Sequence, residues 1–310
     1  MTDPDMPEEN VKRETFIARA VKLFLKIGIT FLCFWYISKK IDFTIAKDAL
    51  LAADWGYVFL AVVLLIISKL FSSLRLNIYF RNINIQLSEW NNIKLYWLGM
   101  FYNLFLPGAI SGDAYKVILL RRKYNAAYKK LSAAVLLDRF SGLLAIGLIL
   151  AMAGLIVLRH PLINTVLISG SILGIAILYV ITRFYFKDFL PGYWSTLFWA
   201  MAVQLTQVVC IFCILKSLHI ETNYATWIFI FLVAAIISVL PISLGGGLGT
   251  REFVFVTGAN YFFLDPHIAV IVSLLFYLSS VIAASWGLYF VFHDPLPGRQ
   301  NNKPVIAQAT

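Results

Sequence analysis

The sequence predicts an all-α polytopic integral membrane protein. Of its 310 residues, 60% are hydrophobic and only 14% are charged, and the mean hydropathy is +0.80. Most helices of this composition cannot face water on any side. Two apolar segments are interrupted by proline and glycine beside charged residues, which is typical of broken helices around a transport site. We expect about six full spans and two opposed re-entrant or broken helices; eight plain transmembrane helices are the alternative.

Nine apolar segments follow one another along the chain, and several reach the roughly 20 residues that a spanning helix needs. They occupy residues 21–38, 55–74, 93–110, 131–158, 162–182, 193–215, 224–244, 253–263 and 267–292. No small-residue cleavage site follows the first of them, so we expect it to remain as a span. Residues 1–19 then form a disordered or interfacial N-terminus, residues 20–293 the transmembrane domain, and residues 294–310 a disordered tail.

Charge placement decides which two segments do not cross. The interval 113–130, interpreted as a loop at the membrane surface, is strongly basic and contains one acid, so it should stay in the cytoplasm. Its basic residues are Lys116, Arg121, Arg122, Lys123, Lys129 and Lys130. Simple alternation from a cytoplasmic N-terminus would put this interval outside. The conflict disappears if 93–110 is a re-entrant hairpin that bends at Pro107-Gly108, with a mirror-image hairpin at 241–249, an arrangement compatible with an inverted repeat.

Both interruptions contain a proline inside an apolar run. Pro107 leaves the carbonyl of Asn103 without its helical donor, and Pro241 does the same to Ile237. Hydrocarbon tolerates such carbonyls only where protein or a water-filled cavity receives them. Both interruptions are therefore candidate binding elements.

The second interruption is rich in glycine and ends on a charged pair. Gly245, Gly246, Gly247 and Gly249 precede Arg251-Glu252, which opens a new helical run. Backbone N–H groups at a helix start, beside an arginine, form a cradle for anions. A structural ion pair at a helix end is the alternative.

Three further charged residues are candidates: Asp113 at the first interruption, and Asp138 and Arg139 a few residues into the apolar run that begins at Leu131. Asp113 follows Gly112 and can either cap the next helix or face the ligand. Asp138 and Arg139 are adjacent on one helix and diverge by about 100°, so each needs a partner elsewhere. They can meet the charges of the two interruptions in a polar cavity, or fix helix register as structural pairs.

Other polar residues in the spans can be explained without a ligand. Lys69 and Arg75 lie near the end of their predicted span, so we expect them to extend to the membrane surface without a special role. Gln204 and Gln207 share one helical face and can hydrogen-bond across helices.

Four motifs, in this order, give the chain its resemblance to the lysylphosphatidylglycerol synthase transmembrane-region family. They are Asn103-x-x-x-Pro107 leading to Gly112-Asp113, the Arg121-Arg122 run, Leu137-Asp138-Arg139, and Pro241-x-Ser243-x-Gly245-Gly246 with Gly249-x-Arg251-Glu252. The resemblance covers nearly the whole chain and implies a flippase-like domain that moves an anionic or lipid-linked headgroup between leaflets. We expect no counterpart of the soluble aminoacyl-transferring domain. Ser111 and Lys116 depart mildly from the family pattern.

The function expected from these observations is lipid translocation in the plasma membrane, with the N-terminus in the cytoplasm. The expected partner is a membrane lipid, either an anionic phospholipid or a lipid-linked glycan, and no nucleic acid, cofactor, metal or catalytic residue is expected. An accessory subunit that scaffolds a lipid- or glycan-modifying membrane enzyme is the alternative. An intramembrane transferase with Asp113 or Glu252 as base ranks last, because no metal or diphosphate motif accompanies them.

Overall fold

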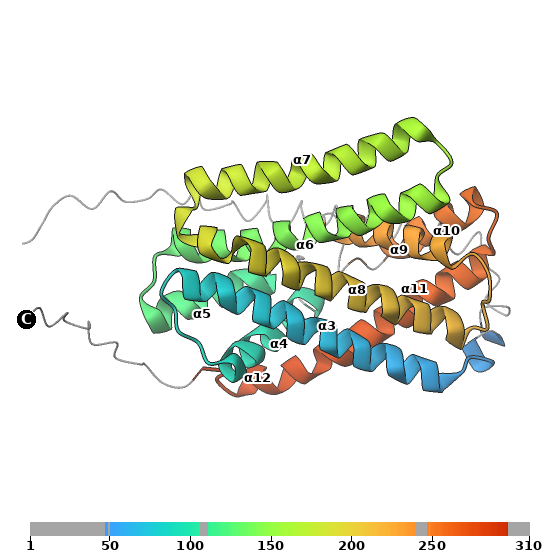
Figure 1. The fold of residues 1–310 in the computed structure, drawn as a ribbon. Helices are drawn as coiled ribbons and strands as arrows, with labels where there is room; N and C mark the ends of the chain where they lie inside the picture. Colours follow the sequence, from blue (N-terminus) through green and yellow to red (C-terminus); the bar gives the residue numbers. More distant parts are fainter. Residues whose placement is uncertain (1–46, 49, 106–110, 240–246, 248, 297–310) are drawn as a thin grey trace, which may run out of the picture.

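The computed structural model describes residues 47–48, 50–105, 111–239, 247 and 249–296 (Figure 1). Within these residues every element is a helix, which confirms the all-α prediction. Five helices are long and apolar enough to cross a membrane. They are α3 (Trp55–Asn82), α6 (Tyr128–Val157), α7 (Pro161–Tyr185), α8 (Tyr193–Ser217) after the 3₁₀ turn η1 (Lys187–Gly192), and α11 (Pro266–Ser285), which η2 (Trp286–Leu288) and α12 (Tyr289–Phe292) extend. The segment 21–38 lies outside the described residues.

Helices α3 and α8 form an antiparallel pair that defines the two ends of the bundle (Figure 1). At one end the Asp54 backbone N–H donates to the Ser217 carbonyl over 2.8 Å. At the other end the Asn82 side-chain amide donates to the Phe189 carbonyl over 3.4 Å. We refer to these as the Asp54 end and the Asn82 end.

Two pairs of shorter helices enter the bundle from opposite ends. Helix α4 (Glu89–Phe105) starts at the Asn82 end and packs against α5 (Ser111–Tyr124), whereas α9 (Tyr224–Val239) starts at the Asp54 end and packs against α10 (Thr250–Tyr261) (Figure 1). Helices α4 and α9, with 17 and 16 residues, reach about 25 Å and so fall short of a hydrocarbon core about 30 Å thick. The prediction of two opposed broken helices is confirmed. The bends themselves, with Pro107, Pro241, Gly245 and Gly246, lie outside the described residues.

The prediction of a surface loop at 113–130 is wrong in two respects. Residues 111–124 are helix α5, the second arm of the first hairpin, so only residues 125–127 remain as a connection to α6. Lys116, assigned to the membrane surface, is buried with 4% exposure. Asp113, Lys116, Val117 and Leu120 recur at helical spacing and form the buried face of α5, because this face packs against α4 and α6.

The apolar core consists of two clusters with a polar layer between them. Along α3, Leu65 belongs to the cluster at the Asp54 end and Leu76 to the cluster at the Asn82 end. Along α6 the same change of cluster occurs between Leu137 and Ile146. The cluster at the Asp54 end includes residues of α9 and α10, and the cluster at the Asn82 end includes residues of α5. The polar layer therefore lies near the middle of α3 and α6, two helices long and apolar enough to cross a membrane.

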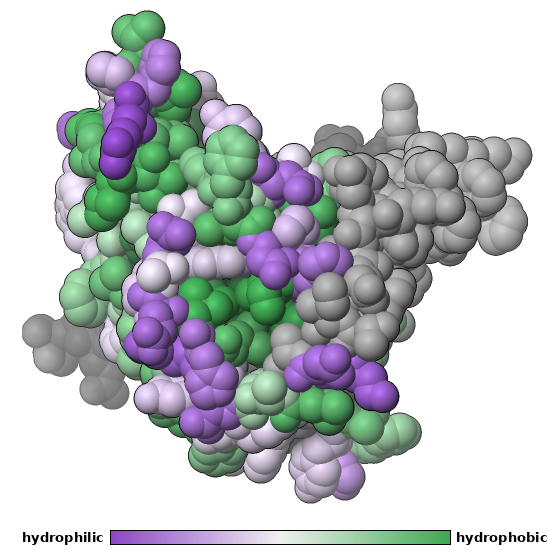
Figure 2. Space-filling view, turned by 90° about the vertical axis from the view of Figure 1, so that its right-hand side faces the viewer, coloured by the Kyte–Doolittle hydropathy of each residue, from purple (hydrophilic) through white to green (hydrophobic). Residues whose placement is uncertain are grey.

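Helix α7 lies at the edge of the bundle. Thr182 is its single buried residue among the described ones, and its apolar side chains are mostly exposed, as expected for contact with lipid (Figure 1). Figure 2 looks onto the Asp54 end, where hydrophilic residues gather around an apolar centre. Such a polar rim fits an end that faces water.

The first residues of the predicted C-terminal tail are part of the fold. The Lys123 ammonium pairs with the Asp294 carboxylate and donates to the Leu296 carbonyl. Leu296 is buried with 1% exposure in the cluster at the Asn82 end. The folded part of the chain therefore extends at least to residue 296, beyond the expected boundary at 293.

Alanine at Gly112 should disrupt the first hairpin. A Cβ atom on Gly112 would lie 1.8 Å from the Gly99 carbonyl oxygen, so α4 and α5 could not keep their present separation. We expect Gly112→Ala to lower the free energy of unfolding by about 1–3 kcal/mol or more, measured by titration with sodium dodecyl sulfate in mixed micelles. Gly170→Ala is the control, since nothing lies within 4 Å of that position on α7, and it should be neutral or stabilising. Equal effects of the two substitutions would contradict this prediction.

Candidate functional site: a basic cavity between two broken helices

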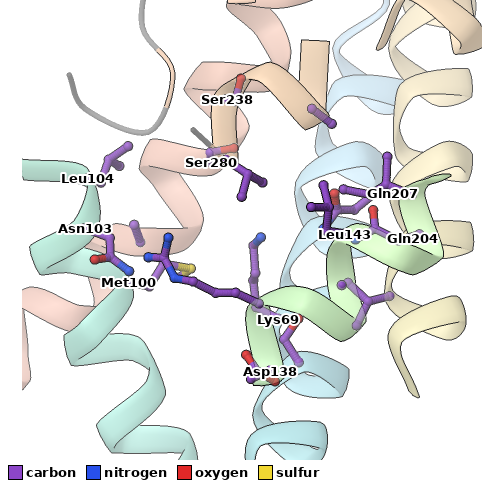
Figure 3. Close-up of a pocket in the computed structure, with 18 of the residues that line it drawn as sticks. Lys69, Met100, Asn103, Leu104, Asp138, Leu143, Gln204, Gln207, Ser238 and Ser280 are labelled. Atoms are coloured by element: carbon purple, nitrogen blue, oxygen red, sulfur yellow. The ribbon is translucent and has the colours of Figure 1, made fainter. Parts of the chain in front are cut away.

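A cavity of about 330 Å³ occupies the polar layer between the two apolar clusters (Figure 3). Residues from α3, α4, α5, α6, α8, α9, α10 and α11 line it, so both broken helices contribute to its wall. Among the residues that the structure describes, its charged side chains are five basic and two acidic ones, namely Lys69, Arg75, Lys116, Arg139 and Arg251 with Asp113 and Asp138. The lining thus carries an excess of three positive charges at membrane depth.

Arg75 on α3 and Asp138 on α6 form the first ion pair of the cavity. The Arg75 Nε–H donates to an Asp138 carboxylate oxygen over 2.7 Å, and both side chains are largely buried, with 7% and 13% exposure. Charges in a membrane interior are costly unless paired in this way. The pair ties the two long helices together at the level of the cavity.

Asp113 on α5 is shared by two cations. One carboxylate oxygen accepts a hydrogen bond from the Lys116 ammonium over 3.0 Å, and the other accepts one from Arg139 on α6 over 2.6 Å. Asp113 is the third residue of α5, and its carboxylate is committed to side chains, so the capping alternative is not how it is used here. The expected meeting of Arg139 with a charge of the first interruption is confirmed, and it couples the hairpin to a full span.

Arg251 and Glu252 diverge at the start of α10. Glu252 accepts a hydrogen bond from the Gly249 backbone N–H over 2.7 Å and another from the Ser273 hydroxyl over 3.0 Å, so it caps the helix and ties it to α11. Gly249 and Gly247 have φ angles of 82° and 103°, which glycine adopts without strain. Arg251 lines the cavity, with its guanidinium 4.9 Å from the centre of the Phe276 ring.

Comparison with known proteins shows the family of this chain. The family described as lysylphosphatidylglycerol synthase TM region matches residues 23–192 and 186–286, which include α3 to α11. The chain belongs to this family. It is also 28% identical, over 170 residues, to the UPF0104 membrane protein PH1989 of Pyrococcus horikoshii. That match covers 54% of this chain and 50% of the relative, so the chain spans about half the length of the curated relative it matches.

Five of the candidate binding residues predicted from the sequence come together in the structure. Asn103, Asp113, Asp138, Arg139 and Arg251 line the cavity. Gly112, Gly247, Gly249 and Glu252 do not line it and instead hold the hairpins in shape. For example, the Gly112 N–H donates to the Asn103 side-chain oxygen over 2.8 Å and closes the first hairpin.

The residues assigned to the basic surface divide into three groups. Lys116 belongs to the cavity, whereas Arg121, Arg122, Lys129 and Lys130 are exposed at the end of α5 and the start of α6. Lys123 is partly buried beneath the C-terminal segment.

Sequence reasoning missed Lys69 and Arg75, which were expected to reach the membrane surface. That expectation is wrong because α3 continues to Asn82. About 10 Å of helix therefore separates Arg75 from the C-terminal end of α3, and the Arg75 side chain is 7% exposed. Lys69, Ser72 and Arg75 recur every three residues, and this polar stripe inside an apolar helix was the signal for a cavity wall.

Proposed function

We propose that this protein moves an anionic, phosphate-bearing lipid headgroup between the two leaflets of a membrane. The observation that carries the proposal is the cavity at membrane depth, which has an excess of three positive charges and is bounded by both broken helices. A phosphate entering it would meet guanidinium and ammonium groups that bind phosphate strongly. The same cavity would repel inorganic cations.

The two opposed hairpins suggest how the cavity could open alternately to each side. Asp113 and Arg139 join the α4–α5 hairpin to α6, and Glu252 and Ser273 join α10 to α11. Discontinuous helices that meet near the bilayer centre are the usual location of a transported ligand. Movement of one hairpin at a time would expose the cavity from the Asn82 end or from the Asp54 end.

The apolar chains of a lipid have a place next to the cavity. A groove of about 250 Å³ between α6 and α7 is lined almost entirely by apolar side chains, among them Phe140, Ile177 and Ile181. Leu143 lines both the groove and the cavity. A headgroup in the cavity could thus remain attached to chains that stay in hydrocarbon.

We further propose that the Asn82 end faces the cytoplasm of a cell whose plasma membrane holds the protein. Arg121, Arg122, Lys129 and Lys130 are exposed there, and short basic segments remain on the cytoplasmic side. They would also attract anionic lipid, at about 1 kcal/mol for each basic residue near the surface.

A proteoliposome assay tests the transport function. Phosphatidylglycerol with a fluorescent acyl chain is placed in both leaflets, and dithionite then quenches the label from outside. We expect the wild-type protein to make nearly all of the label accessible, whereas protein-free vesicles should keep about half protected. Arg251→Ala should slow the exchange about tenfold or more, because a charge-assisted hydrogen bond to phosphate contributes about 1.5–3 kcal/mol.

Arg183→Ala is the matched control, since Arg183 is exposed in the last turn of α7 and lies outside the cavity. This variant should exchange lipid at the wild-type rate. If the wild type exchanges no lipid, the transport proposal fails. Recovery of a lipid- or glycan-modifying membrane enzyme with the gently extracted protein would then favour the scaffold alternative.

A further inference from the structure

Three polar side chains on the α3–α8 wall of the cavity make no hydrogen bond or ion pair within the described residues. They are Lys69 on α3 and Gln204 and Gln207 on α8. Gln204 is 7% exposed, and its side-chain oxygen is buried without a hydrogen-bond partner. A buried polar atom without a partner, such as the Gln204 oxygen, is rare in folded proteins because it costs free energy, so it indicates a missing ligand or water.

The surroundings of Lys69 define the charge of that ligand. The carboxylates of Asp113 and Asp138 are bound to other cations, and Arg75 and Arg251 lie near enough to repel the Lys69 ammonium. Figure 3 shows the Lys69 side chain extending into the cavity, away from Asp138. An anionic group is the partner that would relieve this repulsion.

The two glutamines define a second property of the ligand. Gln204 and Gln207 are three residues apart on α8, so they share one face, and both line the cavity that Lys69 enters (Figure 3). An amide offers N–H donors and a carbonyl acceptor, which together match a hydroxyl group. A hydroxyl can both donate to one amide and accept from the other.

We infer that the α3–α8 wall binds the headgroup of an anionic phospholipid whose headgroup carries hydroxyls and no ammonium. The inference rests on the proposed function and specifies its substrate class. The phosphate pairs with Lys69, and the hydroxyls bond to Gln204 and Gln207. A zwitterionic or aminoacylated headgroup would bring an ammonium into a cavity that already has three excess positive charges.

Lipid competition in native mass spectrometry tests the inference separately from transport. The full-length protein in detergent is given equal amounts of phosphatidylglycerol, phosphatidic acid, phosphatidylethanolamine and lysylphosphatidylglycerol with identical acyl chains. We expect phosphatidylglycerol to be retained about tenfold or more over the two ammonium-bearing lipids. Lys69→Met should weaken this preference, because it lowers the excess of positive charge from three to two. Phosphatidylglycerol should also be retained over phosphatidic acid, whose headgroup lacks the glycerol hydroxyls, and Gln204→Leu should remove that second preference.

Two controls separate binding from folding. Lys187→Met and Gln86→Leu change exposed residues outside the cavity and should keep the wild-type preferences. Lys69→Met should not lower the free energy of unfolding, because the lost charge has no partner in the described structure. Retention of lysylphosphatidylglycerol or phosphatidylethanolamine in preference would overturn the inference. If lipid is exchanged in vesicles but Lys69→Met leaves the preferences unchanged, the transport function stands and this headgroup assignment falls.

Discussion

Replacing Arg75 with methionine should lower the free energy of unfolding by about 3–5 kcal/mol. The substitution leaves the Asp138 carboxylate, 13% exposed, without the guanidinium that lies 2.7 Å from it. The carboxylate must then stay charged in a low dielectric, take up a proton or pull water into the bundle, and each of these costs free energy. Titration of the purified protein with sodium dodecyl sulfate measures the loss.

Arg81→Met on the same helix is the matched control for this substitution. Arg81 pairs with Glu89, but the two side chains are 48% and 42% exposed, so the pair should contribute less than about 1 kcal/mol. The double variant Arg75→Met with Asp138→Leu should recover most of the stability, since an apolar pair needs no solvation. A single variant as stable as Arg81→Met would show that Arg75 and Asp138 do not form a buried pair.

Replacing Asp113 with asparagine should slow lipid exchange about tenfold or more and also destabilise the fold. Asp113 is the carboxylate that both Lys116 and Arg139 contact, at 3.0 and 2.6 Å. Its loss leaves two cations facing each other across the α5–α6 contact, and removing one partner from a buried charge cluster costs about 3–5 kcal/mol. Because that contact joins the first hairpin to a full span, we expect its coordinated movement to fail. Exchange rates in proteoliposomes at equal protein content measure the effect.

Asp188→Asn is the control for Asp113→Asn. Asp188 also pairs with a lysine, Lys130, but both side chains are about half exposed, and neither lines the cavity. This variant should exchange lipid at the wild-type rate. Adding Lys116→Met to Asp113→Asn should return part of the stability while exchange stays slow, because Arg139 still lacks the carboxylate. Normal exchange by Asp113→Asn would mean that this charge cluster has no part in transport.

Several features of the fold were predictable because they follow from local sequence. Apolar segments of spanning length predicted α6 and α8 to within about three residues, and Pro107 and Pro241 marked where α4 and α9 must stop. The helical rotation of about 100° per residue also predicted that Asp138 and Arg139 must have different partners, and they do: Arg75 and Asp113.

The errors arose where a charged residue could be interpreted in two ways. Arg75 was assigned to the membrane surface and Lys116 to a cytoplasmic loop, since a lysine or arginine near a span end usually reaches water. Both are buried beside a carboxylate: α6 brings Asp138 to Arg75, and Lys116 pairs with Asp113 of its own helix. Residue type and position along the chain do not reveal whether a charge faces lipid, water or another helix.

The sequence by itself determined that this protein is a helical membrane protein with two broken helices and an excess of basic residues. These properties depend on composition and on contacts between residues close along the chain. Only the tertiary structure decided which charges meet and that they enclose a cavity. The pairs Arg75–Asp138 and Asp113–Arg139 join residues 63 and 26 positions apart, so they form only when α3, α5 and α6 pack in register. Lys69, left without such a partner in the described structure, is a product of the same packing.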